Sequence, residues 1–158
     1  MQPNPQPSGH AALQDLCARV RQFVDDIAIP AESPAIARDV AALDRCVASL
    51  RDQARQAGLY APQLPVEWGG LGLGWHALAH VLEEAGRGFL GPAALNCAAP
   101  DQPNMLTLLR LGTPAQQERY LRPLVRAQQR ACFAMTEPAP GAGSDPSMLR
   151  TRAERRGQ

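Results

Sequence analysis

The sequence predicts a mainly α protein, with an N-terminal helical bundle of about five or six helices followed by the first strands of an incomplete β-domain. Three observations lead to this fold class. Apolar residues recur at spacings of three and four along the chain as far as Arg130, as they do on one face of a helix. Prolines, glycines and capping residues interrupt this pattern where helices would begin and end. Only after Arg130 does a short apolar run typical of a buried strand appear.

The first two helices are predicted on either side of Pro30. Apolar residues within 13–27 share one helical face, and the proline ends that helix. Ser33-Pro34 is a helix-start signal, because proline favours the first helical position. The unbroken apolar stripe within 36–57 stops at Gly58, as a helix with a C-terminal glycine should. This second helix has the clearest pattern in the sequence.

Three further helices are predicted after a loop. Residues 60–74 hold several prolines and glycines and are expected to form a loop that crosses the surface. Helices are predicted over 75–85 and over about 103–111. Thr113-Pro114-Ala115-Gln116 is a capping box with proline at the first helical position, so a fifth helix begins there. Pro123 should kink this helix.

The end of the sequence predicts the start of a sheet. Residues 132–135 have the character of a buried strand, and residues 149–153 are expected to form a second. A lone hairpin is marginal in water, so we expect an interrupted β-domain rather than a finished one. The predicted domains are therefore a disordered tail over 1–9, a helical domain over 10–129 and the truncated start of a middle β-domain over 130–158.

Composition is that of a soluble globular protein and excludes several classes of function. The chain has 158 residues, 45% of them hydrophobic and 20% charged, and a formal net charge of +1, so no nucleic-acid partner is expected. All sixteen basic residues are arginine, which excludes lysine chemistry such as a Schiff base. No membrane span, secretory signal or paired cysteine motif is found, so we expect a cytoplasmic protein with reduced thiols.

Two patterns favour a plain structural interpretation over a ligand site. Gly72-x-Gly74-x-x-Ala77 fits the loose dinucleotide-binding pattern, but no hydrophobic strand precedes it. His76 and His80 share one helical face, yet no third metal ligand is apparent. We therefore expect close loop packing from the glycines, a surface pair from the histidines, and no metal.

A third glycine-rich run, Gly141 to Asp145, does follow a predicted strand. Successive backbone N–H groups in such a turn can form a concave nest that binds oxyanions, and Ser144 adds a hydroxyl donor. Considered without further context, the residues favour a polar hairpin loop over an anion site.

Longer stretches of the sequence resemble the acyl-CoA dehydrogenase family. The segment CFAMTEPAPGAGSD, Cys132 to Asp145, resembles the flavin-binding signature of these enzymes. LPVEWGGLGL and LRLGTPAQQERYLRPLVRA are similar to two other family motifs, in the same order and spacing. NCAAPDQPNMLTLL is similar to a subgroup, some of whose members carry a kinase-like phosphotransferase domain. The resemblance covers roughly residues 45–157, and four ordered motifs are far more specific than a glycine loop alone.

The resemblance implies an FAD-dependent oxidoreductase that dehydrogenates an acyl-CoA thioester. It implies an electron-transfer flavoprotein or similar acceptor as partner, and a homo-oligomer. The residues that would contact the flavin are Phe133, Met135, Thr136, Gly141, Gly143 and Ser144, and Ser144 would also meet the acyl-CoA. The catalytic carboxylate is expected in a C-terminal domain that these residues lack, so the chain alone is expected to be inactive. Glu137 is assigned to the flavin loop and not as the base.

One departure from the family and one alternative function remain open. The family loop commonly runs Thr-Glu-Pro-Gly-Ala-Gly-Ser-Asp, whereas this chain inserts Ala139-Pro140 before Gly141. The insertion leaves open which glycines would contact the anion. The alternative function is a non-catalytic helical interaction module, or a truncated gene product, that associates with a full-length relative.

Overall fold

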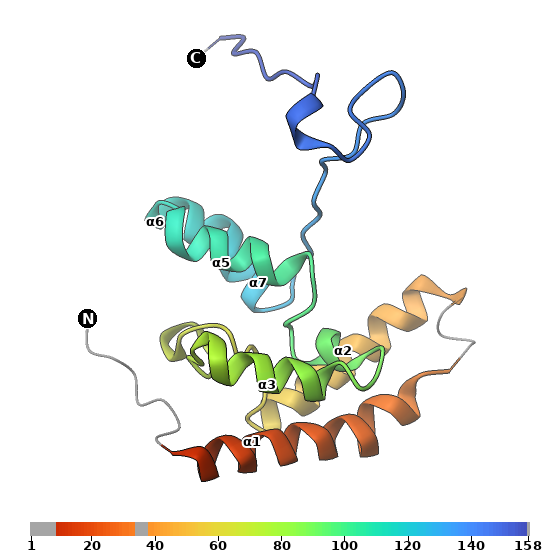
Figure 1. Cartoon of the computed structure of the whole chain (residues 1–158), viewed down its shortest axis with the longest axis vertical. Helices are drawn as coiled ribbons and strands as arrows, with labels where there is room; N and C mark the ends of the chain where they lie inside the picture. The colour runs from red at the N-terminus through yellow and green to blue at the C-terminus, as the bar shows by residue number, and fades with distance from the viewer. Residues whose placement is uncertain (1–8, 34–37, 158) are drawn as a thin grey trace.

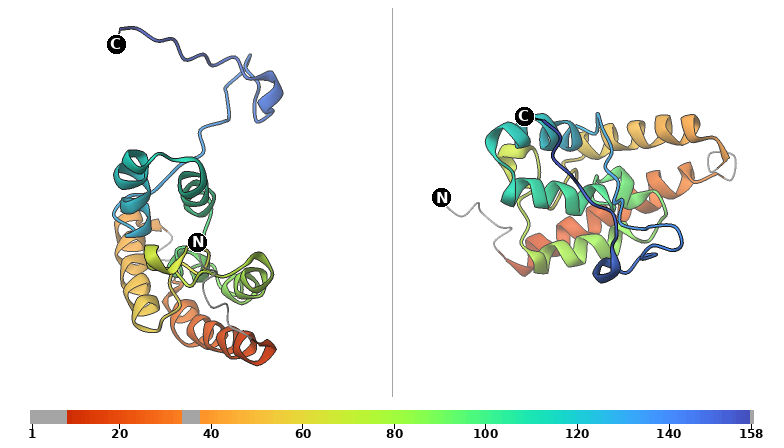
Figure 2. Two further views of the ribbon diagram at one scale, coloured as in Figure 1. Left: turned by 90° about the vertical axis from the view of Figure 1, so that its left-hand side faces the viewer. Right: turned by 90° about the horizontal axis from the view of Figure 1, so that it is seen from above.

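The structure is a computed structural model that describes residues 9–33 and 38–157, so the tail predicted over 1–9 lies outside it apart from Gly9. The described chain is mainly helical, as predicted. Figure 1 shows the helices gathered into one body, while the last part of the chain projects away from them. We call residues 9–33 and 38–131 the helical body and residues 132–157 the arm. The left-hand view in Figure 2 shows the same separation.

Helices α1 (His10–Phe23) and α3 (Trp75–Ala85) lie side by side and form one layer of the body (Figure 1). The bounds predicted for α3 are confirmed. Val20 of α1 and Val81 of α3 are fully buried, so the predicted apolar faces do pack together. At the rim of this layer Arg21 and Glu84 form an ion pair at 2.6 Å.

Two helical segments widen just before a proline that lies beyond their first turn. A π-turn over Val24–Ala28 precedes Pro30, and another over Gln117–Leu121 precedes Pro123. A proline has no N–H for the carbonyl four residues earlier, and a π-turn moves the preceding amide to the carbonyl five residues back. The kink predicted at Pro123 therefore takes the form of this turn. The first segment continues through Pro30 as a 3₁₀ turn and ends at Ala31, one residue later than predicted.

Helix α2 (Val40–Gln56) packs against the short helix α4 (Gly91–Ala94). The start signal expected at Ser33-Pro34 lies partly outside the described residues. In the described part α2 begins after Asp39, whose carboxylate accepts a hydrogen bond from the amide of Ala42 at 3.0 Å. Gly58 has the positive φ of 67° expected of a helix-ending glycine.

The loop over 60–74 does not cross the surface as predicted, because its first part is buried. Its residues 60–64 all belong to the interior, and its only regular element is the 3₁₀ turn Val66–Trp68. The buried polar groups are satisfied within the body: the amide of Ala61 donates to the carbonyl of Leu95 at 2.8 Å. A Cβ at Gly70 would lie 2.2 Å from the carbonyl oxygen of Leu64, so the loop can fold back on itself only with glycine there.

Helix α5 (Asp101–Leu111) and the segment formed by α6 (Pro114–Gln116), the π-turn and α7 (Arg122–Val125) make the other side of the body. Helix α5 begins two residues before the predicted start. The capping box of Thr113 and Gln116 is confirmed, with both of its hydrogen bonds formed.

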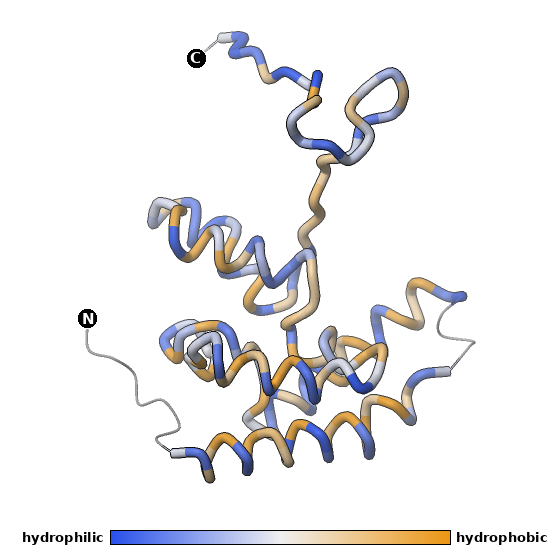
Figure 3. The backbone as a smooth tube through the Cα atoms, in the orientation of Figure 1, coloured by the Kyte–Doolittle hydropathy of each residue, from blue (hydrophilic) through white to orange (hydrophobic). Residues whose placement is uncertain are grey.

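The strands predicted at the end of the chain do not form in the described residues. Residues 132–135 are extended but unpaired, Phe133 is 72% exposed, and residues 149–153 form no ladder either. The one pairing in the arm is an isolated antiparallel bridge between Glu137 and Gly143. A strand is stable only when its backbone groups meet a neighbouring strand, and an apolar pattern cannot supply one. Figure 3 shows this apolar stretch leaving the body without a covering element.

No helix within residues 9–33 and 38–157 is long and apolar enough to cross a membrane.

Candidate functional site

The arm folds into a loop around one carboxylate, that of Glu137. Its oxygens accept hydrogen bonds from the amides of Ala142 at 3.0 Å, Arg150 at 3.0 Å and Thr151 at 2.6 Å, and also from the Thr151 hydroxyl. These donors lie between five and fourteen residues further along the chain. One side chain therefore closes the whole segment from 137 to 151.

The hydrogen bonds made to Glu137 also stabilise the ionised form of its carboxyl. They hold the pKa of its carboxyl at about 2, with the Thr151 hydroxyl as the largest cause and the three backbone amides next. A carboxylate with so low a pKa is a poor acceptor for a substrate proton near neutral pH. The chemistry of Glu137 thus agrees with a role in shaping the loop and not with that of a catalytic base.

The bridge between Glu137 and Gly143 sets the register of the loop. Thr136 and Ser144 each lie one residue outside the bridged pair, so antiparallel pairing sets them on neighbouring stretches of backbone. The inserted Ala139 lies inside a turn that the amide of Gly141 closes by donating to the carbonyl of Pro138 at 2.7 Å. The inserted residue thus lies within this turn, and Gly143 lies opposite Glu137.

The predicted flavin-contacting residues all lie on the arm, and they differ in how free their polar groups are. No hydrogen bond between described residues uses the hydroxyl of Thr136 or of Ser144, and both residues are exposed. The amides of Gly141 and Ala142 donate within the loop. Gly143 has a positive φ of 59°, and nothing lies within 4 Å of the place where its Cβ would be.

These residues fit an oxyanion or flavin ligand as one wall and not as an enclosed pocket. Two unbonded hydroxyls and an open glycine leave donors and space for a nucleotide. The exposed ring of Phe133 and the partly exposed Met135 add an apolar surface beside them. None of the residues predicted to contact the flavin lines either of the two hollows described for this chain.

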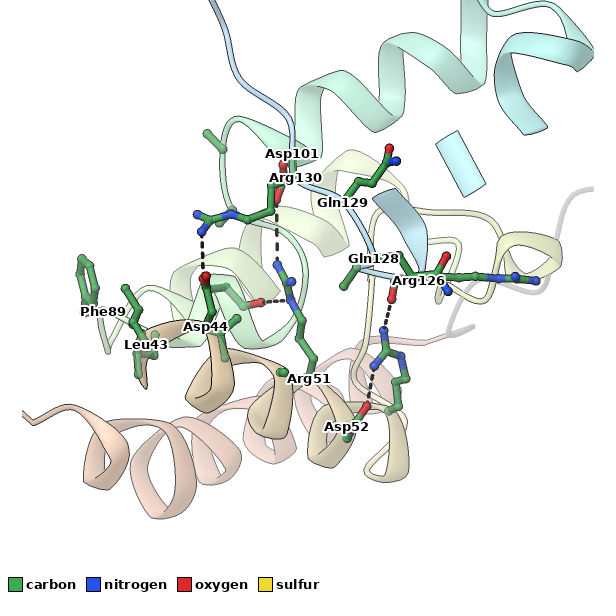
Figure 4. A pocket seen from close by; sticks show the side chains of 18 residues that line it. Leu43, Asp44, Arg51, Asp52, Phe89, Asp101, Arg126, Gln128, Gln129 and Arg130 are labelled. Atoms are coloured by element: carbon green, nitrogen blue, oxygen red, sulfur yellow. Dashed lines mark hydrogen bonds and ion pairs between the residues drawn. The ribbon is translucent and has the colours of Figure 1, made fainter. Parts of the chain in front are cut away.

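The larger hollow lies instead on the helical body, as Figure 4 shows. This groove has a volume of about 740 Å³ and runs between α2, α4 and the turn that follows α7. Buried charges lie at its floor: Arg51 donates to the carbonyl of Ala93 at 3.0 Å and lies 4.0 Å from Asp101. Burial lowers the pKa of the Arg51 guanidinium from its ordinary value.

Sequence reasoning missed Arg51 and Asp101, although a signal for the first was present. Arg51 lies four residues after Val47 and three before Ala54, and so falls beside Leu50 on the apolar face of α2. A charged residue at such a position indicates a buried partner. Asp101 carries no comparable signal, because an acidic residue in the first turn of a helix is common.

The two patterns set aside in the sequence take part in local structure. Gly74 precedes α3 as its N-terminal cap, and the amide of Gly72 donates to the carbonyl of Leu64 at 2.7 Å. The rings of His76 and His80 meet edge to face with centroids 5.0 Å apart. Within the described residues no group of three or more potential ligands could hold a metal ion.

Comparison with known proteins gives consistent similarities. The acyl-CoA dehydrogenase N-terminal domain family matches residues 10–128. Acyl-CoA dehydrogenase family member 10 of Mus musculus is 36% identical over 148 residues, which are 87% of this chain and 14% of that protein. Cyclohex-1-ene-1-carbonyl-CoA dehydrogenase of Syntrophus aciditrophicus is 40% identical over 108 residues, 68% of this chain and 25% of that one.

A solved structure agrees with these sequence similarities. A Mycobacterium abscessus protein provisionally described as an acyl-CoA dehydrogenase superposes with a TM-score of 0.75 at 34% identity. The match covers 89% of this chain and 37% of the other. The chain thus spans between about a seventh and two-fifths of the length of these relatives.

Proposed function

This chain belongs to the acyl-CoA dehydrogenase family, and we propose that it supplies the N-terminal helical domain and one wall of the flavin site of an FAD-dependent enzyme acting on acyl-CoA thioesters. The observation that carries the proposal is the arm loop. Glu137 holds it in a fixed shape, while the hydroxyls of Thr136 and Ser144 remain available for a ligand.

The proposed roles of the arm residues are those that the family resemblance implies, and the chemistry of each residue suits its role. Thr136 donates to the edge of the isoalloxazine ring, and Phe133 and Met135 offer apolar surface to its face. Gly143 and Ser144 hold the pyrophosphate through backbone amides and a hydroxyl, and Ser144 also contacts the acyl-CoA. The chemistry that FAD supplies when bound is acceptance of a hydride from the acyl group.

We propose that this chain alone does not turn over acyl-CoA. Removal of the α-proton needs a carboxylate that is free to accept it, and the carboxylate of Glu137 already accepts hydrogen bonds from four donor groups. The base and the remaining walls of the pocket are proposed to come from outside these residues. So are the contacts that form a homo-oligomer and those with an electron-transfer flavoprotein or similar acceptor.

Titration with FAD tests the proposal directly. We expect the purified chain to quench FAD fluorescence saturably, and we expect Thr136→Val and Ser144→Ala each to weaken binding by about tenfold, since each removes one hydrogen bond to the ligand. Ser147→Ala is the matched control, because its hydroxyl bonds to Asp145 within the arm. Equal affinity of all four proteins, or no binding, would contradict the proposal. Turnover of acyl-CoA with an artificial acceptor, above the rate with free flavin, would contradict inactivity.

A second candidate function is favoured by the exposed backbone of the arm. Residues 132–135 are extended, apolar and unpaired, and such an edge invites pairing with another chain. A non-catalytic module that associates with a full-length relative would use this edge. Light scattering, which measures the mass of a complex, and flavin absorbance together separate the two candidates. A colourless complex with a relative favours association, and a flavin-bound chain favours the enzyme site.

A further inference from the structure

Arg130 and Ala131, the last two residues of the helical body, bond to other residues of the body just before the arm begins. The amide of Ala131 donates to Oδ1 of Asp101 at 2.6 Å, across thirty residues of sequence. The neighbouring Arg130 side chain reaches Asp44 at 3.3 Å. None of the hydrogen bonds found between described residues joins residues 132–157 to the body.

The carboxylate of Asp101 is buried in the helical body beside the guanidinium of Arg51. Asp101 is 8% exposed, and its other oxygen lies 4.0 Å from Arg51, itself 9% exposed and bonded to the carbonyl of Ala93. Asp101 is the first residue of α5, yet no side chain caps that helix end. Its hydrogen bond therefore goes to the root of the arm and is not explained as a helix cap. Figure 4 shows Arg51 and Asp101 meeting below this root.

The ion pair of Arg130 with Asp44 has a different character. The two side chains are 69% and 55% exposed, and an exposed pair of this kind contributes little to stability. Two carboxylates thus contact neighbouring residues at the start of the arm, Asp44 at Arg130 and Asp101 at Ala131. Only that of Asp101 is buried and bonded to the backbone.

The geometry of the arm makes its root important. Four residues of extended chain, 132–135, lie between Ala131 and Thr136, and the five steps from one to the other span about 16 Å. A rotation of about 15° at the root would move Thr136 by about 4 Å, which is more than a hydrogen bond tolerates.

We propose that Asp101 is a positioning residue: its carboxylate, supported by Arg51, fixes the direction in which the arm leaves the body and thereby places Phe133, Met135 and Thr136. The anchor itself is independent of the ligand. Its consequence for flavin rests on the proposed function.

The anchor is tested on the whole chain without any ligand, by exchange and chemical shift of the Ala131 amide in NMR spectra. We expect Asp101→Ala to lower the protection of this amide by at least about tenfold, because the amide loses its acceptor. Asp101→Asn keeps an acceptor oxygen and should rescue most of the protection. Asp44→Asn, the matched control, should leave the amide unchanged. Wild-type protection in Asp101→Ala, or equal loss in Asp44→Asn, would overturn the anchor.

The consequence for the site is tested by FAD titration of the same variants. We expect affinity to fall by about tenfold in Asp101→Ala and by less than about threefold in Asp101→Asn, with no change in Asp44→Asn. Unchanged affinity in Asp101→Ala would overturn the positioning role. If the unaltered chain binds no FAD, the proposed function fails together with the flavin consequence, whereas the Ala131 amide still decides the anchor.

Asp101→Ala leaves Arg51 buried without its partner, and this variant can fail to fold. Circular dichroism would reveal that outcome. Ala131→Pro then takes its place, because it removes the donor and keeps the buried pair of Arg51 and Asp101. Wild-type FAD affinity in Ala131→Pro would overturn the positioning role in the same way.

Discussion

The helical body and the arm satisfy their polar groups in different ways. In the body, side chains such as Tyr60 and Asn96 reach distant carbonyls from fully packed surroundings: Tyr60 donates to Val125 at 2.8 Å and Asn96 to Leu124 at 3.3 Å. In the arm, almost every bond returns to the single carboxylate of Glu137 or to a neighbour in sequence. The body therefore folds around a core, while the arm is shaped by local bonds and stays open to a ligand.

The largest expected effect contrasts two leucines, one from each region. Leu64 is fully buried and Leu149 is 44% exposed. Leu64→Ala should lower the free energy of unfolding by about 2–5 kcal/mol, because it leaves a cavity in the core. Leu149→Ala should change it by less than about 0.5 kcal/mol. Urea denaturation of both variants measures the difference, and similar losses would show that the arm shares the cooperative core.

Substitution of one glycine in each region, Gly70 in the body and Gly143 in the arm, gives a second comparison with a smaller expected effect. In Gly70→Ala the new Cβ would lie 2.2 Å from the Leu64 oxygen and 2.4 Å from the Ala61 oxygen, so we expect a loss of about 1–3 kcal/mol in unfolding free energy. Gly143→Ala meets no atom but keeps a positive φ of 59°, which costs about 1–2 kcal/mol locally. We expect thermal melting of the body to respond to the first variant alone. A lowered melting temperature in Gly143→Ala would contradict the independence of the arm.

The smallest expected effect is a pH response confined to the arm. The folded pKa of Glu137, about 2, lies below its ordinary value of 4.5. The shape of the loop is therefore fully stabilised above about pH 4.5 and loses this support as the pH falls toward 2. The NMR signals of the amides of Ala142, Arg150 and Thr151 should shift together over this range. Glu137→Gln should abolish the response, and a response in the variant would assign it to another group.

Local patterns in the sequence were sufficient to predict much of the helical body. Helix α3 has the predicted bounds of 75–85, because its apolar face is regular and glycines flank it. The capping box at Thr113 forms as predicted, since both of its bonds lie within one turn. Glu137 was assigned to the arm loop from its place in the signature, but its hydrogen bonds from Arg150 and Thr151 were not predicted.

The errors concern segments whose environment is set by distant residues. The loop over 60–74 carries turn residues and so was expected at the surface, but the amide of Ala61 and the side chains of Tyr60 and Gln63 find partners beyond residue 90. Residues 132–135 have the composition of a buried strand but remain exposed, because no described segment pairs with them. Burial and pairing are properties of two partners, and one segment specifies only its own half.

By itself the sequence determined the helical class, the order of the helices and the family, and it predicted which residues would contact a flavin. These properties depend on spacing and on short signatures, which are local. The tertiary structure alone decided the burial of the 60–74 loop, the pairing of Arg51 with Asp101 and the bond from Asp101 to the root of the arm. Their partners lie thirty or more residues apart, and contacts at that separation form only once the helices have packed.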